Sequence, residues 1–541
     1  MSFKTDLRYI LANVMNEHGL KVEFDEIKIE RPLLREHGDF STNIAMVFAK
    51  KLSKSPRELA AELIADIKSK VGANSASDYL GDIEKIEIAG PGFINFYVGN
   101  GWLIKVLIEV LEDGFNSFRR TDFGKGESIQ IEFVSANPTG PLHVGNGWWA
   151  SYGDSLSRLL TRAGYKVEKE YYVNDTGGQI RNLGKSVIAR KNGELPPDDG
   201  YQGEYVSELA RKYIGSDDVV EAGRWAADEI LLDIKETLLK LGVAFDSWYS
   251  QASIEEGGAV KETIEELKMR DVIYEHEGAL WLKSESLGDS RDRVLVKSNG
   301  DVTYTGGDIA YHRDKFITRG FDRVIDIFGA DHHGQVATLK ASMEVLGIEP
   351  NRLEIKLGQM VSLVGSKMSK RSGNFVRLST LIDDIGVDAT RLLSLMNSID
   401  QATTLDIDLV KSTSMENPVY YVQYAYARIS SILRRASDAG VNINELSTQN
   451  ITLNHLKELE MLRIIDELED VLEDAVKSRT PSKVTTYVRS LAGAFHSFYH
   501  DCPVLNDNEE IQRSRLALVV GVKTVFEITL NLLGVSMPEK M

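Results

Sequence analysis

Strand-like and helix-like patterns of apolar residues alternate through the middle of the chain. Residues 128–136 (SIQIEFVSA) are rich in apolar and β-branched side chains, as a strand buried in a parallel sheet would be. A polar loop follows, and then a helix-spaced apolar pattern that stops at Gly164. Residues 165–173 have the pattern of the next strand, and residues 322–331 begin a similar strand–helix unit. This alternation predicts a doubly wound α/β sheet.

The regions on either side follow other patterns. Residues 1–110 mix helical stretches with two strand-like runs around Gly90-Pro91-Gly92, which predict a hairpin. Residues 195–300 are acidic and mainly helical in pattern, which indicates an insertion in the sheet. From Asn417 onward the pattern is all-helical, with Asn417-Pro418 and Thr480-Pro481 as helix starts. We therefore expect three domains: an α+β N-terminal domain (1–110), a doubly wound domain (123–410) that contains the insertion, and an all-α bundle (411–541).

Composition limits the compartment and the partners. The single cysteine, Cys502, excludes an internal disulfide framework and predicts a reducing, cytoplasmic compartment. The sequence shows neither a signal-peptide pattern nor an apolar run long enough to cross a bilayer, so we expect no membrane association. A net charge of −18 leans against nucleic acid as a partner. Local clusters such as Lys50, Lys51 and Lys54 can still bind phosphates, because salt screens distant charges beyond about 10 Å.

The loop at residues 137–146 (NPTGPLHVGN) lies where ligands bind in open α/β sheets, between the end of a strand and the start of a helix. Its prolines and glycines predict a tight backbone with room for a ligand close to the main chain. The following helix offers free N–H groups to a phosphate, and His143 can donate a further hydrogen bond. An ordinary loop with a capping histidine is the alternative interpretation.

A second loop, GSKMSKRSGN at residues 365–374, concentrates positive charge. Lys367, Lys370 and Arg371 lie within five residues, between serines and glycines. Such cations can stabilise the charge that develops on a leaving pyrophosphate. A bare K-x-x-K-R pattern is common on surface loops, whereas the full string KMSKR is far more specific.

Together, the two loops resemble the HIGH-type and KMSKS-type signatures of class I aminoacyl-tRNA synthetases. In that class, the two signatures lie in the two halves of a Rossmann-like catalytic domain. The flanking segments resemble arginyl-tRNA synthetases in particular, at residues 132–146, 171–183, 301–316, 329–334, 417–433 and 532–541. Residues 38–50 and 89–98 resemble the additional N-terminal domain of that family. The resemblance covers nearly the whole chain and is weakest in the insertion.

The resemblance implies ATP-dependent ligation of L-arginine to tRNA(Arg) through arginyl-adenylate, with release of AMP and pyrophosphate. Mg²⁺ would be bound with the ATP, and no permanent cofactor or protein metal site is expected. In this family, adenylate formation typically waits for tRNA to bind. We also expect a monomer.

The resemblance also implies the site residues. Those expected to hold arginine are Glu132, Ser135, Asn137, His143, Tyr304, Asp308 and His332. Those expected to hold ATP are Pro141, His143, Gly145, Asn146, Gly329, Asp331, Met368, Ser369 and Lys370. The catalytic set is His143, Asn146, Lys367 and Lys370, and the set that contacts tRNA is Tyr420, Tyr424 and Arg428. A guanidinium is a planar cation that carboxylates hold best, and Tyr304 and Asp308 share one face if YTGGD begins a helix.

Two departures from the family pattern keep alternatives open. Asn146 stands where the family usually has a second histidine, and Trp148-Trp149 adds bulk inside the helix. We expect one tryptophan to pack under the sheet and the other to cover the site entrance. The two alternatives are a degenerate paralogue that binds without charging and a synthetase for another amino acid. Retention of His143 and both lysines argues against the first, and paired pocket carboxylates favour a cationic substrate. Of the four tyrosines between 420 and 426, we expect at least half to be packing residues.

Overall fold

The structure is a computed structural model that describes residues 2–32, 34–72, 80–330, 333–359, 361–363, 376–405, 407–443, 448 and 450–541. The chain divides into two compact units. The first comprises residues 1–118, 429–467 and 493–525, and the second comprises residues 119–428, 468–492 and 526–541. Asp331, His332 and the whole KMSKR loop (365–374) fall outside the described residues.

The first unit contains a four-stranded antiparallel sheet with strand order β1-β2-β4-β3. The predicted hairpin is confirmed, with Ile88 opposite Ile94 and positive φ at Gly90 and Gly92 in its turn. Phe3 stacks on Phe40 with ring centroids 4.7 Å apart, which ties the first helix to the sheet. The elements are α1 (Phe3–Glu17), β1 (Ile29–Glu30), β2 (Phe40–Thr42), α2 (Ile44–Phe48), α3 (Pro56–Gly72), β3 (Ile83–Ala89), β4 (Phe93–Val98) and α4 (Gly101–Ser117).

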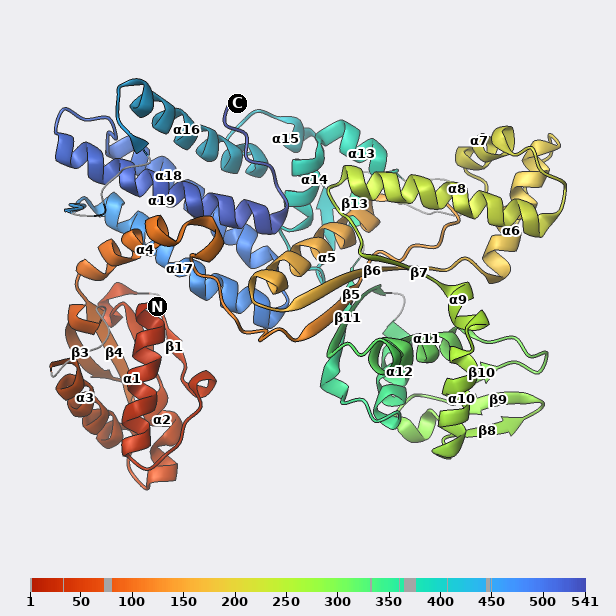
Figure 1. Ribbon diagram of the computed structural model, residues 1–541, viewed down its shortest axis with the longest axis horizontal. Helices are drawn as coiled ribbons and strands as arrows, with labels where there is room; N and C mark the ends of the chain where they lie inside the picture. Colours follow the sequence, from red (N-terminus) through yellow and green to blue (C-terminus); the bar gives the residue numbers. More distant parts are fainter. Residues whose placement is uncertain are drawn as a thin grey trace. The chain divides into compact units, whose positions relative to one another are not determined.

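The second unit is built on a five-stranded parallel sheet with strand order β12-β11-β5-β6-β7. The predicted doubly wound sheet is confirmed, with α5 on one side and α11 and α12 on the other (Figure 1). Strand order reverses between β5 and β11, and open α/β sheets bind ligands at such a switch point. The elements are β5 (Ser128–Glu132), α5 (Val144–Arg162), β6 (Lys166–Val173), β7 (Ser247–Ser250), α11 (Tyr304–Arg313), β11 (Arg323–Gly329), α12 (His333–Val345) and β12 (Leu353–Gly358).

The stretch 195–300 contains strands that its pattern did not predict. One of them, β7, is an edge strand of the main sheet, and three others form a small antiparallel sheet of order β10-β9-β8. Each is four residues long and partly exposed, so it carries too few apolar positions to show a clear alternation. The remaining elements between the halves of the main sheet are α6 (Gly177–Lys191), α7 (Glu204–Lys212), α8 (Val219–Lys240), α9 (Gln251–Glu256), α10 (Ala259–Met269), β8 (Ile273–His276), β9 (Ala279–Leu282) and β10 (Arg293–Val296).

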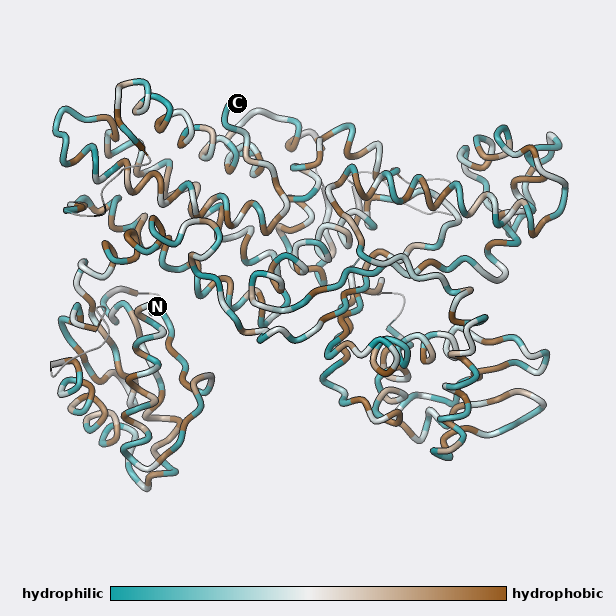
Figure 2. Tube along the Cα trace, in the orientation of Figure 1, coloured by the Kyte–Doolittle hydropathy of each residue, from teal (hydrophilic) through white to brown (hydrophobic). Residues whose placement is uncertain are grey.

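From residue 361 onward, the residues that the structure describes form helices and one short parallel strand pair, and apolar and polar positions alternate along these helices (Figure 2). Pro418 starts α16 as predicted, and the Asn417 side chain accepts a hydrogen bond from Val419 N at 3.0 Å. The last helix, α19, is long and apolar enough to cross a membrane, which the sequence reading had missed, but 72% of its apolar window is buried. The elements are β13 (Val361–Leu363), α13 (Leu378–Ile385), α14 (Val387–Ser394), β14 (Thr403–Leu405), α15 (Ile407–Lys411), α16 (Pro418–Asp438), α17 (Leu456–Ser478), α18 (Ser482–Asp501) and α19 (Glu509–Leu533).

A buried ion pair anchors α5 to its neighbours in the second unit. Arg391 on α14 lies 2.6 Å from the Asp154 carboxylate on α5, and both side chains are almost completely buried. The same guanidinium donates to the carbonyls of Leu533 and Leu241, which close α19 and α8. Burial alone would raise the pKa of Asp154, but the charges of Arg391 and Arg158 outweigh it and lower that pKa. The helix that begins at His143 is therefore fixed by charge as well as by apolar packing.

Arg391→Met will lower the free energy of unfolding by about 3 kcal/mol, because it leaves carbonyls without donors and removes a buried counter-charge. Denaturant unfolding will measure the loss. Lys240→Met is the matched control, since the Lys240–Asp383 pair is exposed and should contribute less than about 1 kcal/mol. Equal losses in the two variants would contradict the anchoring role of Arg391.

Candidate active site

A cavity of about 520 Å³ lies at the C-terminal ends of β5 and β11, at the switch point of the sheet. Of the residues expected from the sequence, the structure places Glu132, Ser135, Asn137, His143, Asn146, Tyr304, Asp308 and Gly329 on its lining. Pro141 and Gly145 are buried in the loop that carries His143. The expected residues Asp331, His332, Lys367, Met368, Ser369 and Lys370 lie outside the described residues.

His143 and Asn146 form a reciprocal cap at the start of α5. The Asn146 backbone N–H donates to His143 Nδ1 at 3.3 Å, and the His143 backbone N–H donates to Asn146 Oδ1 at 3.0 Å. Because Nδ1 accepts, the proton of a neutral ring is on Nε2 and that atom is a donor. The Asn146 amide nitrogen is a second donor. Asn146 thus has a structural reason to replace the usual histidine, since its oxygen closes the cap.

Gly145 is required by the position of the His143 ring. A Cβ at residue 145 would lie 3.1 Å from His143 Cε1 and 3.2 Å from Nδ1, closer than ordinary van der Waals contact. The loop is also bonded to the chain that leaves the KMSKR loop. Val144 N donates to Val376 O at 3.3 Å, and Leu378 N donates to Leu142 O at 2.8 Å. Residues 376–378, which follow the KMSKR loop in sequence, therefore lie against the His143 loop at this edge of the sheet.

The two tryptophans of α5 divide as expected. Trp148 is buried, whereas the partly exposed Trp149 lines the cavity. The Trp149 ring meets His143 edge-on, with centroids 6.4 Å apart. A Cβ at residue 358 would lie 2.2 Å from the Trp149 indole nitrogen, so Gly358 leaves room for the ring.

The turn after β5 has a strained backbone. Val134 and Ser135 have φ of 69° and 35°, which is rare outside glycine and costly for a β-branched residue. The turn brings the Ser135 hydroxyl within 2.9 Å of Glu132 Oε1, to which it donates. Ser135 Oγ in turn accepts a hydrogen bond from Tyr172 N at 3.1 Å. Ser135 therefore fixes Glu132 rather than presenting a free hydroxyl. Asn137 is fixed similarly, by donation to Gln179 Oε1 at 2.8 Å.

Helix α11 begins at Tyr304, so Tyr304 and Asp308 share one face as predicted. The cap comes from Thr303, whose hydroxyl accepts from Gly306 N at 3.2 Å. Tyr304 is 59% exposed at the mouth of the cavity, and Asp308 lies one turn further along the lining.

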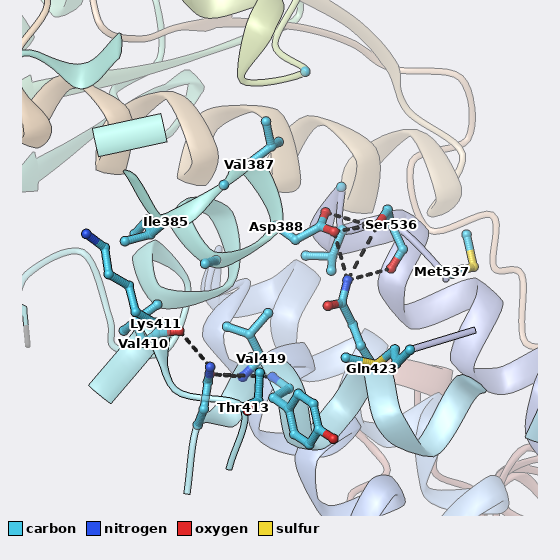
Figure 3. Close-up of a pocket in the computed structure, with 18 of the residues that line it drawn as sticks. Ile385, Val387, Asp388, Val410, Lys411, Thr413, Val419, Gln423, Ser536 and Met537 are labelled. Atoms are coloured by element: carbon cyan, nitrogen blue, oxygen red, sulfur yellow. Dashed lines mark hydrogen bonds between the residues drawn. The ribbon is translucent and has the colours of Figure 1, made fainter. Parts of the chain in front are cut away.

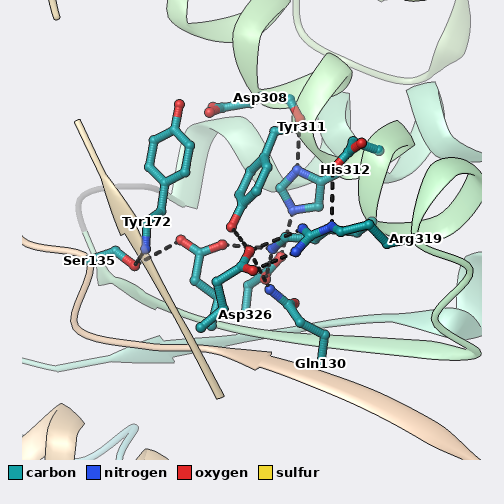
Figure 4. A network of polar contacts seen from close by, with 12 residues as sticks. Gln130, Ser135, Tyr172, Asp308, Tyr311, His312, Arg319 and Asp326 are labelled. Atoms are coloured by element: carbon teal, nitrogen blue, oxygen red, sulfur yellow. Dashed lines mark hydrogen bonds and ion pairs between the residues drawn. The ribbon is translucent and has the colours of Figure 1, made fainter. Parts of the chain in front are cut away.

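Beneath the cavity, charged side chains form a buried network (Figure 4). Asp326, Glu132 and Glu170 are register partners on the adjacent strands β11, β5 and β6. In-register neighbours of parallel strands point to the same face, so three carboxylates stand in a row. Cations from the segment after α11 cover the row: Lys315 Nζ lies 2.7 Å from Glu132 and 2.8 Å from Asp326, and Arg319 binds Glu170.

Sequence reasoning missed this network and several lining residues. His312 Nε2 lies 2.7 Å from Asp326, and Tyr311 donates to Glu170. The missed lining residues are Tyr172, Asn174, Gln179, Gln251, Tyr311, His312 and Gln335. The available signal was a row of polar residues at helical spacing, Asp308, His312, Lys315 and Arg319, next to strands that carry acidic residues among apolar ones.

The tyrosines of α16 are mostly not in the core. Tyr420 and Tyr424 stack with centroids 5.5 Å apart, and the Arg428 guanidinium lies 4.6 Å from the Tyr424 ring centroid. Tyr426 is buried, with its hydroxyl 3.1 Å from Glu527, whereas Tyr420, Tyr421 and Tyr424 are partly buried. That at least half of the four tyrosines are packing residues stays a prediction.

A second cavity of about 710 Å³ lies beside Tyr420, between α14, α16 and the residues after α19 (Figure 3). Asp388 closes one side of it. That carboxylate accepts from Gln423 Nε2 and from Ser536 N, both at 2.8 Å. These bonds tie the C-terminal residues to α14 and α16.

The parallel sheet and the capped HVGN loop, together with the KMSKR string of the sequence, define a class I aminoacyl-tRNA synthetase. Residues 202–421 match the family described as tRNA synthetases class I (R), catalytic domain. Residues 2–98 match the arginyl tRNA synthetase N terminal domain, and residues 422–541 match the DALR anticodon binding domain.

Full-length relatives give the same family. The chain is 43% identical to the arginine–tRNA ligase of Desulforamulus reducens over 542 residues, covering 96% of this chain and 95% of the relative. It is 41% identical to that of Listeria welshimeri, covering 99% and 98%. The chain belongs to the arginyl-tRNA synthetase family, as the sequence predicted. The structure of Thermus thermophilus arginyl-tRNA synthetase has the same fold, with a TM-score of 0.80 at 20% identity and full coverage of both chains.

Proposed function

We propose that this chain joins L-arginine to tRNA(Arg) in two steps. First, a carboxylate oxygen of arginine attacks the α-phosphorus of ATP, and the bond to pyrophosphate breaks to leave arginyl-adenylate. Next, a ribose hydroxyl of the 3′-terminal adenosine attacks the activated carbonyl, and AMP leaves. Mg²⁺ enters with the ATP and offsets phosphate charge. No side chain has to act as a nucleophile, so positioning and electrostatics supply the rate.

The observation that carries this proposal is that one 520 Å³ cavity is lined both by carboxylates and by the capped start of α5. Asp308 and Tyr304, which share a helix face, line it together with Glu132, and we call this set the acidic end. Carboxylates and a phenol offer acceptors to the five donors of a planar guanidinium. Because Lys315 and Ser135 already contact Glu132, we assign the main ion pair with substrate to Asp308.

At the other end, the donors on His143 and Asn146 and the N-terminus of α5 suit phosphate oxygens. We assign Gly329 to the ribose, Asn137 to the α-amino or carboxylate group of arginine, and Pro141 and Gly145 to the shape of the loop. By family resemblance, the site is completed by Asp331, His332, Lys367, Met368, Ser369 and Lys370.

For tRNA, we assign Tyr420, Tyr424 and Arg428 to contacts with unpaired bases, since partly exposed rings and a stacked guanidinium suit that role. We propose that residues 1–110 provide a further tRNA contact, residues 123–410 the catalytic domain and residues 411–541 the anticodon contact. Cys502 is a free cysteine, which fits a reducing compartment. We propose that the protein is cytoplasmic and monomeric.

Pyrophosphate exchange and tRNA charging test the proposal. The purified chain is given ATP and each amino acid in turn, with and without tRNA(Arg). Arginine alone should support exchange and become attached to tRNA, and exchange should depend on tRNA. Charging of another amino acid, or binding of arginine without charging, would refute the proposal.

A further inference from the structure

Lys315 is the most deeply buried lysine of the site, and the reaction proposed above gives it no task. Its side chain is 0% exposed, and its ammonium bridges Glu132 on β5 and Asp326 on β11. It comes from a single π-helical turn, Asp314–Thr318, that continues α11. Such turns are frequent at functional sites. The ammonium also lies 4.2 Å from the centre of the Tyr311 ring, which attracts cations.

Two facts separate this lysine from an ordinary ion pair. Glu132 lines the cavity. Its carboxylate therefore contacts Lys315 and also borders the space that we assign to the substrate. Burial alone would lower the pKa of Lys315, but Asp326 and Glu132 outweigh burial and raise that pKa above its ordinary value. The ammonium is therefore a permanent charge at physiological pH. A buried carboxylate without such a partner takes up a proton instead.

We propose that Lys315 is a positioning residue for the amino-acid substrate, which holds the Glu132 carboxylate fixed towards the cavity. The Ser135 hydroxyl holds one Glu132 oxygen and the Lys315 ammonium holds the other. Each carboxylate oxygen accepts two hydrogen bonds, so lone pairs remain for a substrate cation. This inference rests on the proposed function, because it assumes that a cationic substrate reaches Glu132.

Charged and titratable groups approach Lys315 from every adjoining element. Burial alone would raise the pKa of Asp326, but Lys315 and His312 outweigh burial and lower it. Burial likewise opposes ionisation of Glu170, but the hydrogen bond from Arg319 lowers its pKa. The full set is Glu132, Glu170, Tyr172 and Asp326 on the strands, Asp308, Tyr311 and His312 on α11, Asp314 and Arg319 after it, and Tyr249 on β7.

Lys315→Met will raise the KM for arginine at least about tenfold, because a buried carboxylate loses its counter-charge. The kcat at saturating arginine should change less than about threefold, since Lys315 does not contact the reacting atoms. Calorimetric titration with arginine should show the same loss of affinity. Lys315→Arg restores the positive charge with a different shape, so it should recover part of the lost affinity for arginine.

The pH dependence separates this role from a merely structural one. In Lys315→Met, the acidic limb of arginine binding should move upward by about one pH unit or more, because Asp326, whose pKa Lys315 lowers, then binds a proton more readily. Arg313→Met is the matched control. Arg313 lies on the same helix and contacts two carboxylates, Glu262 and Glu266, but they belong to α10 and do not line the cavity. It should leave the KM for arginine and its pH profile unchanged.

Thermal unfolding decides whether each variant is folded. If Lys315→Met does not fold, Lys315→Met/Asp326→Asn removes one carboxylate together with the cation, and it should still show the raised KM. A folded variant with the wild-type KM for arginine, or with a raised KM and an unchanged pH profile, would overturn the proposal. If the wild-type chain fails to charge arginine, the proposed function fails instead, so the two failures are distinguishable.

Discussion

Asp308→Asn will lower kcat/KM for arginine by about a hundredfold or more, while the KM for ATP stays within about a factor of two. The carboxylate lies on the cavity lining one helical turn from Tyr304, where a guanidinium can meet both. Removing one partner of a desolvated ion pair costs about 2–5 kcal/mol, which corresponds to roughly 30- to several-thousand-fold in affinity. An amide keeps the shape and one acceptor but not the charge, so the loss measures charge recognition.

Steady-state charging of tRNA at varied arginine measures this effect. Asp301→Asn is the control, since that carboxylate is exposed just before α11 and bonds to the neighbouring Asn299 at 2.9 Å. It should leave both KM values unchanged. A wild-type kcat/KM in Asp308→Asn would mean that the substrate cation is held elsewhere, with Glu132 as the first alternative.

The sequence predicts the frame of this site because the frame depends on local patterns. The apolar run of β5, the Gly and Pro loop and the helical spacing of α5 lie next to one another in the chain, so periodicity alone places His143 at a helix start. The spacing of Tyr304 and Asp308 likewise predicts a shared face once a helix begins at Tyr304. Family resemblance supplies the assignment of these positions to arginine and ATP.

The buried charge network could not be predicted in the same way. Asp326, Glu132 and Glu170 meet only because three strands that are far apart in sequence pair in one register. Periodicity detects the faces of a strand but not its register with a neighbour. The π-helical turn that carries Lys315 has no sequence signature comparable to a cap or a glycine turn. Glu132 therefore looked like a substrate ligand alone, whereas two protein side chains also contact it.

Asn146 illustrates the opposite case, in which local chemistry was available in the sequence. A side-chain acceptor at the N-cap and another three residues later form a reciprocal cap. His143 and Asn146 have that spacing, and the structure shows both hydrogen bonds.

His143→Ala will slow adenylate formation by about a hundredfold to a thousandfold, the typical effect of removing one donor to developing transition-state charge. It will also lower the free energy of unfolding by about 1 kcal/mol, because the cap of α5 is lost. His143→Asn separates the two effects. Asparagine is among the best N-cap residues, so it should preserve stability, yet its short side chain cannot place a donor where imidazole Nε2 lies.

Pyrophosphate exchange in the presence of tRNA measures the rate, and denaturant unfolding measures the stability. We expect both variants to be slow and only the alanine variant to be less stable. If His143→Asn recovered the rate together with the stability, the imidazole would serve only to cap α5. The phosphate contact would then have to come from Asn146 and the helix N-terminus, since these are the remaining donors of the loop that the structure describes.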